Sequence, residues 1–234
     1  KGDEPHQLMM SATPIPRTLA MSYYADLDVS VIDELPPGRT PVITKLVSDS
    51  RREEVLARVR QACLAGQQAY WICPLIDESD TLELQTALET HQRLAQALPD
   101  LRVGLVHGKL NTAEKLHAMA AFKTGETHLL VATTVVEVGV DVPNAAMMVI
   151  EHAERMGLAQ LHQLRGRVGR GAAQSLCILL FQQPLSELAR ARLKIIYENT
   201  DGFEIAQQDL NLRGPGELLG ARQSGVQTQA ARQM

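Results

Sequence analysis

Short runs of apolar residues alternate along this chain with longer segments in which apolar residues recur every three or four positions. The apolar runs predict strands at residues 42–47, 69–75, 103–106, 129–133, 146–151 and 176–181. The periodic segments between them predict amphipathic helices, because that spacing places apolar side chains on one helical face. Strands that alternate with helices through short connections are typical of a mostly parallel sheet covered on both faces. The pattern therefore predicts an α/β fold.

Polar residues indicate where several of these helices begin and end. Three residue pairs have the spacing of a capping box, in which two side chains satisfy the first free backbone N–H groups of a helix: Ser50 and Glu53, Asp80 and Glu83, and Asn111 and Glu114. The three helices are expected to end near Gly66, Pro99 and Gly125 respectively. A further helix is predicted at residues 157–166.

The pattern changes at both ends of the chain. After Pro184, residues 187–198 and 203–211 predict two helices without strands, followed by a glycine-rich segment. Near the start, the proline-rich residues 35–41 predict a linker. Because the chain opens with Lys1 and soon enters an apolar run, we expect a fragment of a longer protein. The predicted division is a tail and connector at residues 1–41, an α/β lobe at 42–183 and a helical hairpin at 184–234.

Composition narrows the class of protein only slightly. Aromatic residues make up 3% of the chain, so the core has to be built from Leu, Val, Ile, Ala and Met. Three cysteines without a close pair argue against a disulfide framework, and the histidines show no metal-binding spacing with them. With no apolar run long enough for a membrane span and no signal-peptide pattern, we expect a cytoplasmic protein without a bound structural metal.

The net charge of −4 argues against nucleic-acid binding, although its distribution is less adverse. Acidic residues predominate before residue 150, whereas basic residues outnumber acidic ones in the rest of the chain. A local positive surface is therefore compatible with the second part of the sequence. Composition alone would not have suggested DNA.

The chain contains no phosphate-binding loop of the form Gly-x-x-x-x-Gly-Lys-Ser/Thr. The nearest segment, Gly104 to Lys109, has the wrong spacing, and Leu110 stands where a hydroxyl is needed. Two apolar runs end in an Asp-Glu pair, at residues 31–34 and 75–78, in the manner of a metal-binding strand. Without a phosphate-binding loop such pairs have no triphosphate to serve, so we interpret both as structural.

The chemically most informative segment is Gln163-Leu164-Arg165-Gly166-Arg167-Val168-Gly169-Arg170. Glycines allow its backbone to approach another surface closely, and Arg167 and Arg170 are three residues apart. A guanidinium group offers a planar fork of donors suited to phosphate oxygens and keeps its charge at any working pH. The segment is compatible with arginine fingers for a nucleoside triphosphate bound elsewhere, and equally with a solvated basic loop.

An apolar run at residues 129–132 ends in Thr133 and Thr134, and Gly139 and Asp141 follow shortly after. This pattern is typical of a buried parallel strand followed by a turn. It also places hydroxyl groups at the carboxyl end of a strand, where open α/β sheets bind ligands. The two interpretations are compatible.

Taken together, these segments resemble the conserved motifs of superfamily 2 helicases. Residues 129–141 and 163–170 are similar to motifs V and VI, and residues 10–18 are similar to motif III. The connector and motif IV region is matched by residues 35–41, 69–73 and 104–108. Residues 209–225 resemble the translocation motif of the RecG family of bacterial ATP-dependent DNA helicases, which remodel stalled replication forks. The resemblance covers nearly the whole chain and implies a RecA-like helicase lobe.

In that family ATP and Mg²⁺ lie between two lobes, and this chain resembles the second lobe. The resemblance implies that Arg167 and Arg170 reach the γ-phosphate across the cleft and that Gln163 senses the nucleotide. Gly139 and Asp141 are expected to lie near the ribose or to hold the arginines. ATP and Mg²⁺ would be bound mainly by the first lobe, so this chain alone is expected to be inactive.

The resemblance also implies contacts with branched double-stranded DNA. Thr133 and Thr134 are expected to face the DNA backbone or the cleft, and His107 and Gly108 to lie along the DNA path. Three residues are expected to couple ATP hydrolysis to DNA movement: Arg192, Arg213 and Gln223. For Arg192 the alternative is a solvated helix charge, and for residues 213–225 a turn-rich cap that closes the domain.

Two other assignments remain open at this point. The transcription-repair coupling factor family, Mfd, shares the motif VI region, but it usually has Ala at the position of Pro215 and lacks a close match to residues 35–41. A non-catalytic DNA-binding or protein-interaction module would use the Arg-Gly segment only to grip phosphates. The expected partners of the main assignment are branched DNA, the upstream helicase lobe and a wedge domain of the same chain.

Overall fold

The computed structural model describes residues 30, 39–73, 80–133, 142–171 and 173–213. It contains one six-stranded sheet in the order β1-β6-β5-β2-β4-β3, and every neighbouring pair of strands is parallel. The strands are β1 Ile43–Ser48, β2 Gln68–Cys73, β3 Val103–Val106, β4 Leu129–Thr133, β5 Ala145–Ile150 and β6 Leu176–Phe181. The predicted α/β class with a mostly parallel sheet is confirmed.

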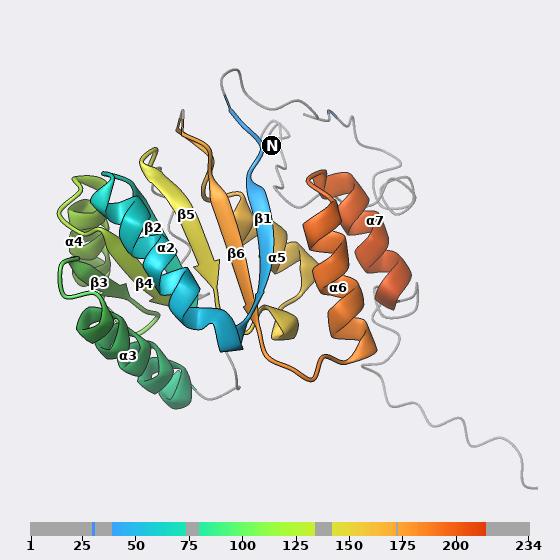
Figure 1. Ribbon diagram of the computed structural model, residues 1–234, viewed down its shortest axis with the longest axis horizontal. Helices are drawn as coiled ribbons and strands as arrows, with labels where there is room; N and C mark the ends of the chain where they lie inside the picture. The colour runs from blue at the N-terminus through green and yellow to red at the C-terminus, as the bar shows by residue number, and fades with distance from the viewer. Residues whose placement is uncertain (1–29, 31–38, 74–79, 134–141, 172, 214–234) are drawn as a thin grey trace, which may run out of the picture.

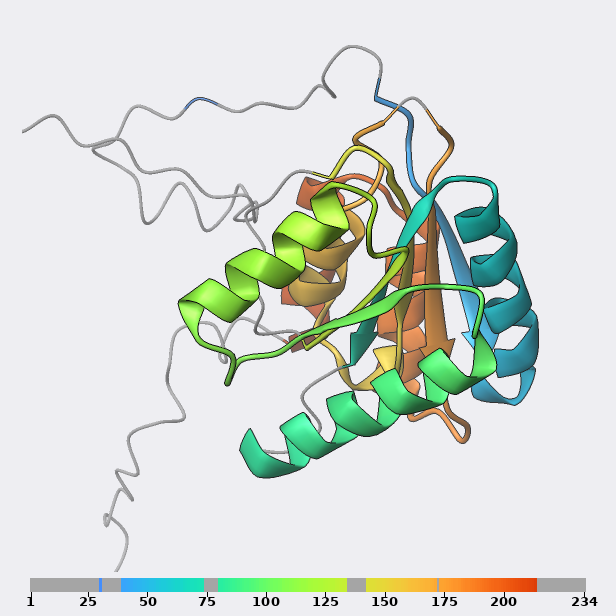
Figure 2. The same cartoon turned by 90° about the vertical axis from the view of Figure 1, so that its left-hand side faces the viewer.

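Helices cover both faces of this sheet (Figure 1). α2 (Arg52–Leu64) and α3 (Asp80–Ala97) lie on one face, and α4 (Thr112–Lys123) and α5 (Leu158–Arg165) lie on the other (Figure 2). α6 (Glu187–Glu198) and α7 (Gly202–Arg213) form a hairpin beside β1, where both contact α5. Two short 3-10 turns, η1 (Asp49–Arg51) and η2 (Ala153–Arg155), follow β1 and β5. The chain thus has three layers, with the hairpin at one edge.

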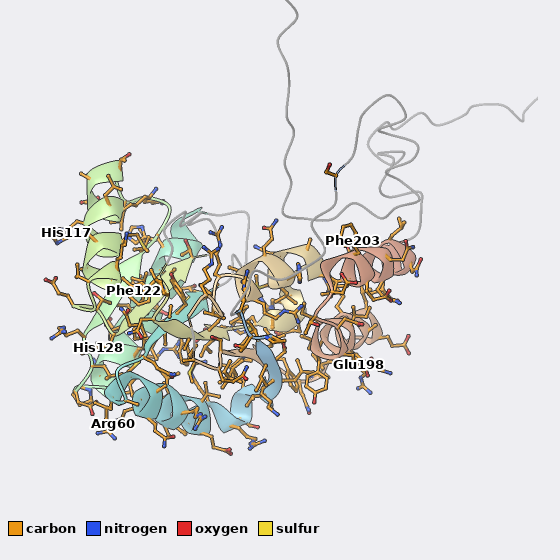
Figure 3. All side chains as sticks on the ribbon, turned by 90° about the horizontal axis from the view of Figure 1, so that it is seen from above. Arg60, His117, Phe122, His128, Glu198 and Phe203 are labelled. Atoms are coloured by element: carbon orange, nitrogen blue, oxygen red, sulfur yellow. The ribbon has the colours of Figure 1, made fainter. Side chains whose placement is uncertain are left out.

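The core lies on the two faces of the sheet, because alternate residues of each strand point to opposite sides. On the α2–α3 side Trp71 packs with Leu94 and Val131. On the other side Tyr70 meets Phe122 of α4 edge to face, with ring centroids 4.8 Å apart. Figure 3 shows Phe122 among the side chains between α4 and the sheet. Strands buried on both faces explain why the sequence shows continuous apolar runs rather than alternation.

One predicted capping box is confirmed and another is wrong. The side chain of Asn111 accepts a hydrogen bond from the backbone N–H of Glu114, and the Glu114 carboxylate accepts from the backbone N–H of Asn111. Ser50 makes no such cap. Its hydroxyl hydrogen-bonds the hydroxyl of Ser48, residues 49–51 form a 3-10 turn, and α2 begins one residue later than a cap at Ser50 would place it.

The helices of the hairpin match the prediction closely. α6 begins after Ser186, whose side-chain oxygen accepts from the backbone N–H of Ala189. Its apolar face buries Ala189, Leu193 and Ile196. α7 extends two residues beyond the predicted end, to Arg213. No helix in the described parts of the chain is long and apolar enough to cross a bilayer.

Several sequence-based predictions concern residues outside the described ranges. These are the motif III-like segment at residues 10–18, most of the linker at 35–41, both Asp-Glu pairs and the glycine-rich segment after α7. The capping pair of Asp80 and Glu83 also lies beyond description, because only the backbone of α3 is described at those positions. The division into three domains stays a prediction.

Candidate functional site

The Arg-Gly segment lies at the amino edge of the sheet, where the strands begin. α5 starts after β5 at the carboxyl edge and runs back across the sheet, so the residues after it lie close to the start of β1 and β6. Arg170 is exposed there, Arg167 is half-buried, and Gln163 is exposed on the last turn of α5. The segment therefore presents cationic side chains on a surface of the protein, as an arginine finger requires.

Glycine is needed at position 169 for two reasons. Its φ of +83° lies in the left-handed region, which residues with a side chain rarely adopt. A Cβ atom at this position would also lie 2.8 Å from Cγ2 of Val42, closer than such atoms approach. The turn that carries Arg170 thus packs directly on the chain just before β1.

Arg39 holds the same turn from the other side. Its Nε donates a hydrogen bond to the carbonyl oxygen of Gly169 at 3.1 Å, and its Nη2 donates to that of Gly166 at 3.0 Å. A longer contact, 3.5 Å, joins Nη2 to the carbonyl oxygen of Val168. Arg39 lies in the predicted linker, and its position in the sequence indicated no role for it. No local signal could have found these contacts, because they join residues about 130 positions apart.

Arg165, in the same motif, is buried. It is 4% exposed, and its Nη1 donates to the carbonyl oxygens of Ile196 and Asn199 at 2.7 and 2.8 Å. The same atom lies 3.2 Å from the hydroxyl oxygen of Thr44. Burial lowers the pKa of the Arg165 guanidinium. Arg165 thus caps the carboxyl end of α6 and ties it to α5.

The sequence did contain a signal for the burial of Arg165. The buried residues of α5 are Leu158, Leu161 and Arg165, which follow the helical spacing of three and four. Arg165 therefore lies on the apolar face of the helix, whereas Gln163 lies on the exposed face. Of the three arginines in the segment, the helical period separates the buried one from the two that follow the helix.

Arg192 is not the solvated helix charge that the alternative described. Its Nη1 donates to the carbonyl oxygen of Met156 at 3.2 Å, and its Nη2 donates to that of Glu154 at 3.3 Å. The side chain is half-buried between α6 and η2. Together with Arg165 it gives the hairpin two cationic attachments to the chain between β5 and the Arg-Gly segment.

A second group of predicted residues lies at the opposite edge of the sheet. Thr133 ends β4 and His107 follows the neighbouring β3, so both are at the carboxyl edge. Thr133 is 1% exposed, and its hydroxyl has no hydrogen-bond partner among the described residues. Gly108 is exposed, and its carbonyl oxygen accepts from Nζ of Lys115 at 2.8 Å. A strand of five or six residues separates the two edges, roughly 17–20 Å.

The structure thus brings His107, Gly108 and Thr133 together at one edge and places Arg167 and Arg170 at the other. Five predicted site residues are not placed by it. Thr134, Gly139, Asp141 and Gln223 lie outside the described residues, as does the side chain of Arg213. Among the residues that are described, no cluster of His, Cys, Asp and Glu could hold a metal ion.

A partly buried ion pair, for which the sequence held no clue, lies next to the carboxyl edge. The carboxylate of Glu151, just after β5, accepts from Nη2 of Arg52 and from Nε1 of Trp71, the latter at 2.7 Å. The Arg52 guanidinium also lies over the Trp71 ring, 5.2 Å from its centroid. Burial opposes the charge of Arg52, but Glu151 and Asp49 outweigh it and raise its pKa. The pair locks α2 to the end of β5.

Comparison with known proteins defines the class to which this arrangement belongs. Residues 53–172 match the helicase conserved C-terminal domain family, and the chain belongs to that family. Residues 199–231 match the C-terminal part of domain 3 of the ATP-dependent DNA helicase RecG. Both matches agree with the motifs found in the sequence.

The similarity to RecG extends over nearly the whole chain. The ATP-dependent DNA helicase RecG of Escherichia coli (strain K12) is 64% identical over 226 residues, which make up 96% of this chain and 33% of the relative. RecG of Aquifex aeolicus is 53% identical over 96% of this chain and 29% of its own length. The chain therefore spans about a third of the length of the curated relatives it matches. The predicted resemblance to a carboxyl-terminal part of RecG is confirmed.

Solved structures support the same conclusion. A structure of RecG bound to a three-way DNA junction superimposes with a TM-score of 0.75 at 50% identity, covering 89% of this chain and 27% of that one. The Mycobacterium smegmatis helicase Lhr superimposes with a TM-score of 0.55 at 17% identity, over 81% of this chain and 25% of that chain. At that identity the second match shows the fold alone. The predicted RecA-like lobe is confirmed.

Proposed function

We propose that this chain is the second motor lobe of an ATP-dependent double-stranded DNA translocase that acts on stalled replication forks and recombination intermediates. The single observation that carries the proposal is the Arg-Gly segment. It presents an exposed Arg170 on a turn shaped by Gly169 and held at its carbonyl oxygens by Arg39. Family membership and the similarity to ATP-dependent DNA helicases named RecG supply the reaction class.

The proposed task of the segment is to stabilise charge on the transferring phosphoryl group of ATP. Phosphoryl transfer is catalysed mainly by positioning and by neutralising charge, and an arginine supplied across a cleft is worth about 10³–10⁵ in rate. Arg167 and Arg170 would act on the γ-phosphate, with Gln163 beside them on the exposed side of α5. Gly139 and Asp141 are proposed to lie near the ribose. The sequence lacks a phosphate-binding loop, so another lobe would bind MgATP.

The proposed DNA path follows the carboxyl edge of the sheet. His107 and Gly108 follow β3, Thr133 is the last residue of the neighbouring β4, and Thr134 comes next in the sequence. Hydroxyl and backbone groups are common partners of DNA phosphates. Contacts of this kind hold a duplex in place without reading its sequence. They suit a motor that moves along DNA of any sequence. Branched DNA is accordingly the proposed partner, and the cytoplasm the proposed location.

We assign to the helical hairpin the coupling between ATP hydrolysis at the amino edge and DNA movement at the carboxyl edge. Arg165 joins α5 to the carboxyl end of α6, and Arg192 joins the middle of α6 to η2. Both attachments are hydrogen bonds from buried or half-buried cations to backbone carbonyls. A displacement of the Arg-Gly segment would therefore also displace the hairpin. Arg213 and Gln223, which follow the hairpin, are proposed to pass this movement to the duplex.

ATP hydrolysis in the presence of branched DNA tests the proposal. The 234-residue chain and the full-length protein to which it belongs are compared with and without DNA. We expect DNA-stimulated hydrolysis from the full-length protein and none from the chain alone. Salt-sensitive binding of DNA by the chain alone, unchanged by nucleotide, together with a full-length protein that does not hydrolyse ATP, would instead indicate a non-catalytic DNA-binding module.

A further inference from the structure

Arg39, which lies in the predicted linker, contacts the Arg-Gly segment at residues 163–170 through side-chain hydrogen bonds. Its guanidinium group donates to the carbonyl oxygens of Gly166 and Gly169 at 3.0 and 3.1 Å, from Nη2 and Nε respectively. The two acceptors are the first and last residues of the turn that follows α5. One rigid fork therefore spans the whole turn.

A second set of contacts connects the same two stretches of chain. Val42 lies against Gly169, and the side-chain nitrogen of Gln174 donates to the carbonyl oxygen of Pro41 at 2.8 Å. The backbone N–H of Ile43 donates to the carbonyl oxygen of Ser175 at 2.9 Å. Residues 39–43 thus run alongside both limbs of the turn, before and after Arg170.

The physical role of these contacts follows from the composition of the turn. Glycines 166 and 169 allow many backbone conformations, and a carbonyl oxygen without a donor would favour others that reach water. The Arg39 fork satisfies two carbonyl oxygens in one geometry, one of which belongs to the residue that caps α5. These hydrogen bonds favour the observed arrangement of the turn, and with it one direction in which Arg170 leaves it.

We propose that Arg39 is a positioning residue for the phosphate-directed arginines: it aligns Arg170 by holding the carbonyl oxygens of Gly166 and Gly169. The proposal rests on the function proposed above, because only a motor lobe needs Arg170 aligned on a nucleotide. Arg39 belongs to the segment that leads toward the first lobe in the predicted organisation. The alignment of the arginines is thus tied to the chain that joins the two lobes.

The test uses the full-length protein with branched DNA, in which kcat and KM for ATP and the melting temperature are measured. Arg39→Ala is expected to lower kcat about 10²-fold, as a misplaced catalytic group does, while KM changes by less than about twofold. Arg39→Lys should recover part of the loss, since an ammonium group can still donate to one carbonyl oxygen. Arg58→Ala, which removes an exposed arginine of α2, is the matched control and should leave kcat unchanged.

A double mutant separates positioning from direct contact with ATP. If Arg39 acts through Arg170, Arg39→Ala should slow the Arg170→Ala enzyme by less than about twofold, because coupled residues are not additive. A further loss as large as in the wild-type background would overturn the proposal, and so would a normal kcat for Arg39→Ala. Normal turnover by Arg170→Ala would instead refute the proposed function itself.

Should Arg39→Ala fail to fold, Gly169→Ala and Arg39→Lys carry the test. Gly169→Ala strains the same turn through its φ and through Val42 while leaving Arg39 in place. A folded Gly169→Ala enzyme with a lowered kcat and an unchanged KM supports the proposal. A folded enzyme with wild-type kcat contradicts it, because the shape of the turn would then not matter for turnover.

Discussion

The two edges of the sheet are built in different ways. At the amino edge the functional candidates are charged side chains on a glycine-rich turn, and a distant arginine satisfies its carbonyl oxygens. At the carboxyl edge the candidates are a buried hydroxyl, an imidazole and an exposed backbone, supported by Lys115 and by the pair of Arg52 and Glu151. Charged groups in fixed directions suit a reaction on phosphate, whereas hydroxyl and backbone groups on a stable edge suit contacts that must form and break repeatedly. The edges should therefore respond differently to mutation.

The largest effect is expected at the amino edge. Arg170→Ala in the full-length protein should lower DNA-stimulated ATP turnover by about 10³-fold or more, because it removes charge stabilisation of the transferring phosphoryl group. Arg170 is exposed, so circular dichroism and the melting temperature should stay unchanged. Arg58→Ala again serves as the control. Turnover near the wild-type rate would contradict the proposal that the amino edge acts on ATP while the carboxyl edge contacts DNA.

Behind the carboxyl edge the expected effect is on stability rather than on catalysis. Arg52→Met leaves the carboxylate of Glu151, which is 4% exposed, without its cation. Breaking such a pair by removing one partner costs about 3–5 kcal/mol, and the free energy of unfolding from urea titration should fall by that amount. The exposed pair of Arg51 and Glu54 provides the comparison, and Arg51→Met should leave the free energy of unfolding nearly unchanged, because water screens an exposed pair.

A smaller loss is expected where the hairpin is attached. Arg165→Met keeps a long side chain between α5 and α6 but leaves the carbonyl oxygens of Ile196 and Asn199 without their donor. Unsatisfied buried groups cost about 1–3 kcal/mol, which should appear in the same urea titration. The full-length variant should also lose more of its DNA translocation than of its ATP hydrolysis. Translocation is measured by displacement of a triplex-forming strand. An equal loss of both activities would contradict a role of the hairpin in coupling ATP hydrolysis to DNA movement.

The smallest effect is a dependence of stability on pH near the same attachment. Burial, and then the charge of Arg165, lower the pKa of His162 below its ordinary value. Protonation of His162 is thus less favourable in the folded chain than in the unfolded chain. The stability associated with neutral His162 is fully present above the unfolded pKa, about 6.5, and declines as the pH falls below it. Thermal unfolding between pH 7.5 and 5 should show this decline, and His162→Gln should reduce it.

The elements that were predicted most accurately are those with local causes. The ends of β3, β4, β6 and α6 match the predicted residues, because short apolar runs and helix caps are set by neighbours in the sequence. The capping box at Asn111 formed for the same reason. The one predicted at Ser50 did not form, since the spacing alone could not show that the Ser50 hydroxyl would pair with Ser48.

The sequence predicted which side chains of the candidate site carry the chemistry, but not the distant residues that hold the site in place. The motif identified Arg167 and Arg170 as the residues to test, and their role as phosphate ligands stays a prediction. Arg39 and Glu151 were assigned no role, because their partners lie about 130 and 99 residues away in the sequence. Contacts at such separations have no local signature. They exist only once the sheet has brought β1 beside β6 and α2 beside β5.

By itself the sequence determined the alternation of strands and helices, the parallel sheet that this alternation requires, and the segment in which arginines meet glycines. The helical period placed Arg165 on the apolar face of α5, but only the tertiary structure decided which groups surround it and that Arg170 is exposed. Arg165 falls on the face of α5 that meets α6, so backbone carbonyls surround it, whereas Arg170 follows a left-handed glycine that turns the chain toward the surface. Both outcomes depend on packing between elements far apart in the chain, because that packing determines how far each side chain is buried and which hydrogen bonds it makes.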